Sequence, residues 1–218
     1  MTQPSILAAA DYADALITAR RAKTTVFLLV MLLLVVELAL FFIARYTKVT
    51  LVSPDGKASL MGQLFQYLIG LIDFLGLVLP ALLAVIIGLI LNVQLVGRLL
   101  GTGRMTSAFL WCVLIVFLLF PWQSFLNNPV LNNDPAGIRI PGILYTWAEF
   151  SHERLGARFD AKADLRIGIL RWARFVGFPI VALILLATVQ LRSDRGLRQA
   201  LGGSAAATTD NTLDSTPT

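Results

Sequence analysis

Four ionisable residues lie within or at the edge of long apolar stretches: Glu37, Asp73, Arg171 and Arg174. Charged side chains are costly inside a membrane, and they usually face a partner charge or a water-filled path. Two carboxylates and two guanidinium groups could pair between helices and orient a bundle. They could also carry a proton, an ion or an anionic headgroup, or face a partner subunit.

The positions of these four charges predict that they share one leaflet. With a helical rise of about 1.5 Å per residue, Glu37 lies roughly 12 Å inside the end of the first apolar run, near Arg45. Asp73 follows the start of the second run, and Arg171 and Arg174 lie within two turns of the start of the fourth. Because successive spans alternate in direction, all four charges are expected in the same half of the membrane.

The composition identifies the elements that must hold these residues. Of 218 residues, 57% are apolar and 14% are charged, and the mean hydropathy is +0.76. A soluble domain carries about 25% charged residues. These values exclude an ordinary cytosolic domain, a disordered chain and a disulfide-rich secreted module, and they predict an all-α, polytopic membrane protein.

The apolar runs predict four transmembrane helices in a bundle, since a span needs about 20 apolar residues. Pro80 should kink the second helix, because proline lacks the backbone N–H. The transmembrane domain is expected over residues 24–198, with spans at about 25–45, 66–95, 105–125 and 167–191.

Three further segments are expected outside the hydrocarbon. Residues 1–23 are expected to form an N-terminal interfacial helix. The polar connection 126–166 is expected to carry an amphipathic helix in its second part. Residues 199–218 are small and polar, and they are expected to form a flexible tail.

Tryptophan and arginine residues near the span ends are candidate lipid anchors. Such side chains gather where the membrane meets water, and a guanidinium can bind a lipid headgroup. The candidate anchors are Trp122, Trp147, Trp172, Arg154 and Arg158.

The sequence offers no signature of catalysis. His152 is the only histidine and Cys112 the only cysteine, so this chain by itself cannot hold a bis-histidine haem or form an internal disulfide. Neither an HExxH nor a GxSxG motif is present. We therefore expect no enzyme activity, no metal and no cofactor. We also expect no nucleic-acid partner, because no dense basic stripe with interleaved aromatic residues occurs.

Basic residues close to the span ends favour a topology with both termini in the cytoplasm, by the positive-inside rule. The bias toward Leu, Ala and Arg favours a bacterial inner membrane. The residues that this topology places inside are Arg20, Arg21, Lys23, Arg98, Arg104, Arg192, Arg195 and Arg198.

Two functions remain open. The preferred interpretation is a non-catalytic accessory, anchoring or scaffold subunit of a larger membrane complex, with the lipid bilayer and protein subunits as partners. The alternative is a small ion- or proton-conducting component of a transporter or channel, in which Glu37 and Asp73 carry the ion.

Overall fold

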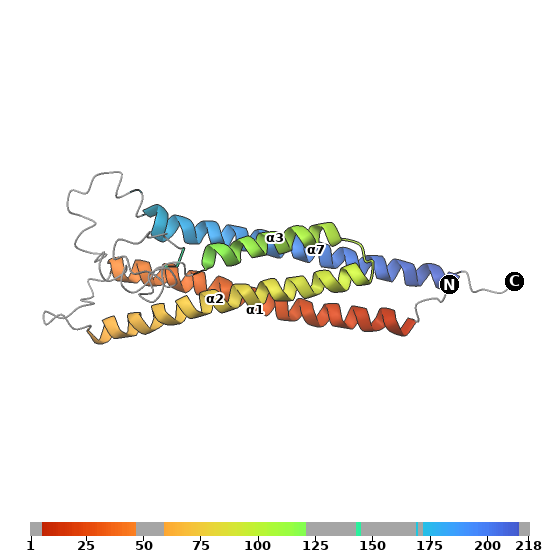
Figure 1. Cartoon of the computed structure of the whole chain (residues 1–218), viewed down its shortest axis with the longest axis horizontal. Helices are drawn as coiled ribbons and strands as arrows, with labels where there is room; N and C mark the ends of the chain where they lie inside the picture. Colours follow the sequence, from red (N-terminus) through yellow and green to blue (C-terminus); the bar gives the residue numbers. More distant parts are fainter. Residues whose placement is uncertain (1–5, 47–58, 121–142, 145–168, 170–171, 214–218) are drawn as a thin grey trace, which may run out of the picture. The chain divides into compact units, whose positions relative to one another are not determined.

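The protein is built from long helices. The computed structural model describes residues 6–46, 59–120, 143–144, 169 and 172–213. Its elements are α1 (Ile6–Tyr46), α2 (Leu60–Val96), α3 (Thr102–Leu119), the π-helical turn η1 (Ala173–Gly177) and α7 (Phe178–Leu213), shown in Figure 1. No strand occurs within these ranges, which confirms the predicted all-α class.

Four helices are long and apolar enough to cross a membrane, as predicted. The chain is therefore a multi-pass membrane protein. With 41 residues and a rise of about 1.5 Å each, α1 is roughly 60 Å long, about twice the thickness of a bilayer core. The candidate spans are Asp14–Ala44, Leu60–Val96, Thr102–Leu119 and Ala173–Leu201.

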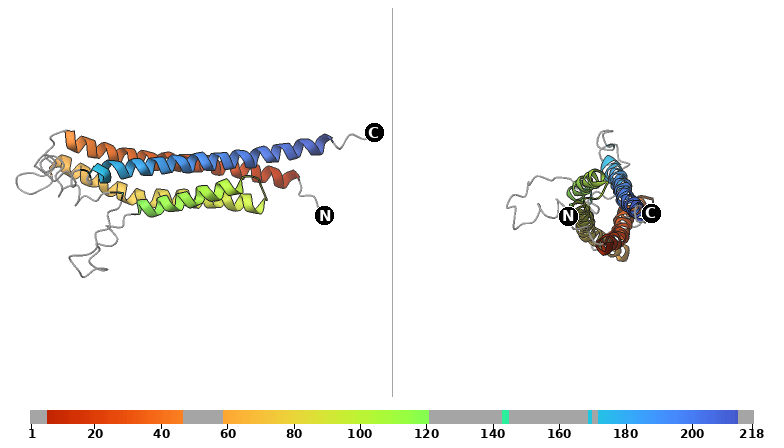
Figure 2. Two further views of the ribbon diagram at one scale, coloured as in Figure 1. Left: turned by 90° about the horizontal axis from the view of Figure 1, so that it is seen from above. Right: turned by 90° about the vertical axis from the view of Figure 1, so that its right-hand side faces the viewer.

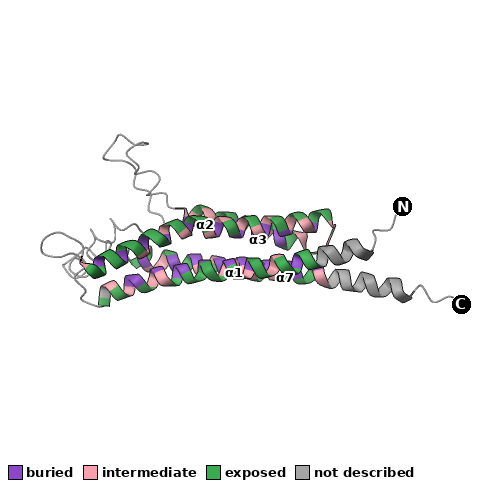
Figure 3. Cartoon of the chain, turned by 90° about the horizontal axis from the view of Figure 1, so that it is seen from below, coloured by how far each residue is buried: buried purple, intermediate pink, exposed green. Residues whose placement is uncertain are grey.

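Each helix buries one stripe of residues, most of them three or four positions apart. Figure 3 shows the buried residues recurring along the helices between exposed ones. This spacing is typical of helices that pack side by side with knobs in holes. We call these buried positions the core positions. In α3 they are Met105, Ala108, Cys112, Ile115 and Leu119, and in α7 they include Ala182, Leu186, Val189, Ser193 and Leu197.

The chain divides into two compact units. Unit 1 comprises Met1–Leu28, Ala81–Leu114 and Leu185–Thr218, and unit 2 comprises Leu29–Pro80 and Ile115–Ile184. Both chain ends and the α2–α3 turn thus belong to unit 1. This grouping is the one expected when four successive helices alternate in direction.

The turn between α2 and α3 is short, as Figure 2 shows between the yellow and green helices. The Leu99 N–H donates to the Gln94 carbonyl at 3.0 Å, and Arg98 has a positive φ of 48°. Gly101 has a φ of 91°, which favours glycine. A Cβ at Gly101 would also lie 2.7 Å from the Gly196 carbonyl oxygen, so α3 and α7 approach closely there.

The segments expected at the two chain ends are continuous with the outer spans. Residues from Ile6 onward belong to α1, because no glycine or proline interrupts the alanine-rich sequence that leads into the apolar run. Within this helix the Thr24 and Thr25 hydroxyls donate to the Arg20 and Arg21 carbonyls one turn earlier, so neither residue ends the helix. Likewise, α7 continues to Leu213, so the tail expected from residue 199 is helical over most of its length. The connection expected to carry an amphipathic helix lies almost wholly outside the described residues.

Two prolines lie within helices. Pro80 is inside α2, which runs through it from Leu60 to Val96. Pro179 is buried at the start of α7, and the π-helical turn η1 precedes it, with the Phe178 N–H donating to the Ala173 carbonyl. Proline has no N–H to donate, and its ring clashes with the carbonyl four residues earlier, so the helix widens locally just before it.

Candidate functional site

A buried charged cluster joins α1 to α7 in unit 1. The Lys23 side chain is fully buried, and its Nζ donates to Ser193 Oγ at 2.7 Å and to Asp194 Oδ1 at 2.6 Å. Gln190 Nε2 donates to the other Asp194 oxygen at 3.3 Å. The Ser193 hydroxyl in turn donates to the Gln190 carbonyl at 3.1 Å. We call these four residues the Lys23 cluster.

Lys23 points inward because of its position along α1. Leu16, Lys23, Val30 and Glu37 are spaced by seven residues, and all four are buried. Seven residues are close to two helical turns, so these side chains lie on one face. Lys23 is therefore a core residue. It differs in this from the exposed flanking charges on which the positive-inside rule relies.

The geometry of the cluster suits a structural ion pair. Asp194 is 26% exposed, while Lys23 has no exposed surface. Both Asp194 oxygens and the Lys23 ammonium are hydrogen-bonded, as a buried pair requires if its attraction is to offset desolvation. The cluster can thus fix the register of α1 against α7.

Three of the four charges that the sequence singled out are described residues of unit 2. Glu37 is fully buried on α1, and Asp73 is half-buried on α2. Arg174 is half-buried within η1, and its guanidinium carbon lies 6.0 Å from the Phe175 ring centre. Their common leaflet, their pairing and their role remain predictions.

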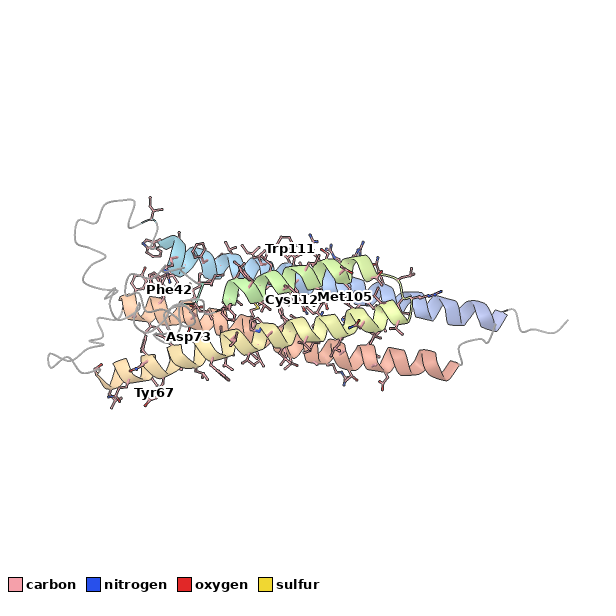
Figure 4. All side chains as sticks on the ribbon, in the orientation of Figure 1. Phe42, Tyr67, Asp73, Met105, Trp111 and Cys112 are labelled. Carbon is pink, nitrogen blue, oxygen red and sulfur yellow. The ribbon has the colours of Figure 1, made fainter. Side chains whose placement is uncertain are left out.

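Aromatic rings connect α1 to the start of the fourth span in unit 2. The Phe41 ring stacks on Phe175 with centres 5.3 Å apart and planes 12° from parallel. Trp172 meets Phe41 edge to face at 6.1 Å. Trp172, predicted as a lipid anchor, is 38% exposed and also packs against this protein core. Figure 4 labels Phe42 on α1 and Asp73 on α2, both in this unit.

Cys112 is a buried core position of α3, which is the environment of an inert thiol. The remaining residues that the sequence singled out lie outside the described part of the chain. The undescribed candidates are Arg171, Trp122, Trp147, Arg154 and Arg158, together with His152.

Gln94 is a further buried polar residue of unit 1. Its side chain has no exposed surface, and neither its Nε2 nor its Oε1 has a hydrogen-bond partner within the described residues. A buried amide without partners costs free energy. Gln94 occupies a core position of α2, four residues after Ile90.

The sequence reasoning missed the Lys23 cluster, although a signal was present. The seven-residue spacing from Leu16 through Lys23 to Glu37 could have assigned both charges to one buried face.

Among the described residues, no group of three or more potential metal ligands comes together. No family model, curated protein or solved structure matches this chain.

Proposed function

We propose that this protein is a non-catalytic membrane subunit that anchors or scaffolds a larger membrane assembly. The observation that carries the proposal is the Lys23 cluster, in which buried charge is used to hold two helices together. The Lys23 ammonium has no exposed surface and donates to Ser193 and Asp194, so its charge is satisfied by contacts within the bundle.

The outer faces of the helices support a role in lateral contacts. Large apolar side chains are exposed along every candidate span, for example Leu32 at 58%, Phe74 at 63% and Phe117 at 60%. In a membrane such faces contact lipid or the helices of another subunit. Polar contacts buried inside the bundle and apolar faces on its outside suit a subunit on which other subunits assemble.

The scaffold proposal is tested by purifying the full-length chain in a mild detergent and measuring the intact mass of the assembly. Partner chains at a fixed stoichiometry are expected, and they should remain through a second chromatography step. A monodisperse chain without partners would contradict the proposal.

A second function is favoured by one residue. Glu37 is a fully buried carboxylic acid within the candidate span Asp14–Ala44, seven residues from its end, and such residues often mark proton or ion paths. On this alternative the protein is a small conducting component, and Asp73 on α2 extends the path.

Reconstitution in liposomes separates the two functions. If the alternative holds, Glu37→Gln abolishes proton or cation flux while the protein still inserts and assembles. The matched control is Asp14→Asn, which removes an exposed carboxylate from the same helix. Wild-type liposomes without flux above empty liposomes would exclude the alternative.

A further inference from the structure

The contact between α3 and α7 in unit 1 carries arginine residues on its exposed side. A Cβ at Gly196 would lie 3.4 Å from both the Gly101 carbonyl oxygen and the Met105 nitrogen, so the backbones are close. About one turn earlier in α7, Arg192 Nη1 donates to Ser107 Oγ at 2.5 Å. The two helices run antiparallel through these contacts.

Two more arginines lie one turn away from this hydrogen bond, and both lie toward the α2–α3 turn. Arg104 precedes Ser107 by three residues on α3, and Arg195 follows Arg192 by three residues on α7. Because the helices are antiparallel, both steps lead in the same direction. Arg104, Arg192 and Arg195 are all exposed. We call these three residues the arginine triad.

The local charge around the triad is strongly positive. The described side chains of unit 1 include eight Lys and Arg residues, and their only carboxylates are Asp14 and Asp194. Asp194 is already bonded to Lys23 and Gln190. In addition, α3 begins at Thr102, so the positive end of its dipole lies one turn or less from Arg104. Three exposed arginines within one turn of the same helix contact, with no carboxylate bonded to them among the described side chains, favour an anion.

The position of the triad along the spans indicates that this anion lies at the membrane surface. Arg104 is two residues after the start of the candidate span Thr102–Leu119, and Arg195 is six residues before the end of Ala173–Leu201. The Arg192 guanidinium carbon is 5.9 Å from the Trp111 ring centre, which orients the guanidinium together with its bond to Ser107. Figure 4 labels Trp111 on α3, on a different side of the helix from the core residues Met105 and Cys112.

Exposed apolar residues continue from the triad along both helices. Leu110 follows Ser107 by one turn and is 63% exposed, and Leu191 precedes Arg195 by one turn and is 58% exposed. These side chains can contact acyl chains while the arginines contact a phosphate above them. A free phosphate ion would use only the charged part of this surface.

From these observations we propose that the arginine triad binds the phosphate headgroup of an anionic phospholipid at the outer side of the α3–α7 contact. Arginine suits this role because its planar fork donates two parallel hydrogen bonds to phosphate oxygens. The site is independent of the scaffold function, since it requires only that unit 1 face an anionic leaflet.

The test measures lipid binding to the purified full-length protein by native mass spectrometry, with phosphatidylglycerol and phosphatidylcholine of the same acyl chains. The triad variant carries Arg104→Gln, Arg192→Gln and Arg195→Gln. The matched control loses the same charge from other exposed or half-exposed positions of unit 1, through Arg20→Gln, Arg21→Gln and Arg98→Gln.

The wild type and the control are expected to prefer phosphatidylglycerol, and the triad variant should bind it on the order of 100-fold more weakly, at about fivefold per arginine. Equal losses in both variants, or no loss in either, would overturn the proposal. So would displacement of the lipid by inorganic phosphate at matched concentration. If loss of the Arg192 contacts unfolds the triad variant, the double variant Arg104→Gln/Arg195→Gln retains them, and it should weaken binding about 30-fold.

Discussion

Removal of Asp194 provides the sharpest test of how this bundle is held together. Asp194→Ala leaves the Lys23 ammonium buried with one remaining partner, Ser193. Breaking a buried ion pair from one side costs about 3–5 kcal/mol. Because Asp194 is 26% exposed, water can reach the vacated site, and the lower end of this range applies.

The double variant separates the ion pair from simple packing. Lys23→Met keeps a long side chain of similar volume and removes the charge, so Lys23→Met/Asp194→Ala contains no buried unpaired charge. Replacing both partners of a buried pair with apolar groups is often close to neutral. We therefore expect the double variant to recover most of the stability that Asp194→Ala loses, with a coupling energy of about 2 kcal/mol.

The measurement is reversible unfolding in mixed micelles, followed by circular dichroism as the denaturing detergent is increased. A loss of about 3 kcal/mol changes the unfolding equilibrium constant by more than 100-fold. The control is Asp14→Asn, an exposed acid on α1, which should change the stability by no more than about 0.5 kcal/mol. The reasoning is refuted if Asp194→Ala matches this control, or if the double variant is no more stable than Asp194→Ala.

Three further substitutions probe the packing by the same unfolding measurement. Gln94→Met should stabilise the protein by about 1 kcal/mol, because it removes a buried amide without partners among the described residues; a loss would mean that the amide has a partner. Gly101→Ala should cost about 2 kcal/mol or more, through its positive φ and its approach to Gly196, and a neutral result would contradict this backbone contact. Phe41→Ala should cost about 3 kcal/mol by emptying the stack with Phe175, and a cost below 1 kcal/mol would argue against that stack.

Polar residues at core positions have a consequence for specificity. Lys23, Glu37, Gln94 and Ser193 are the buried polar or charged residues among those described, and each interrupts an otherwise apolar stripe. Apolar stripes alone allow helices to slide by a turn with little change in contact. A polar residue that must meet its partner fixes one register, usually at a cost in stability. For Lys23 and Ser193 the partner is visible.

The number and class of the helices were predictable because they depend on local sequence. A run of about 20 apolar residues is stable in a bilayer core whatever its neighbours are, so four such runs give four spans. The limits of the helices were less predictable. The polar residues between Ile6 and Thr24 form helix as readily as the apolar run that follows, and hydropathy alone does not register that continuity.

The amino-acid sequence by itself thus determined that the chain is helical, that it crosses a membrane four times and that it carries rare charges in apolar surroundings. Only the tertiary structure decided which charges meet. Lys23 and Asp194 are separated by 171 residues, and neither hydropathy nor charge counting links two positions so far apart. Their contact depends on the phase of α1 and α7 and on the register between them, and the packing of the side chains sets both.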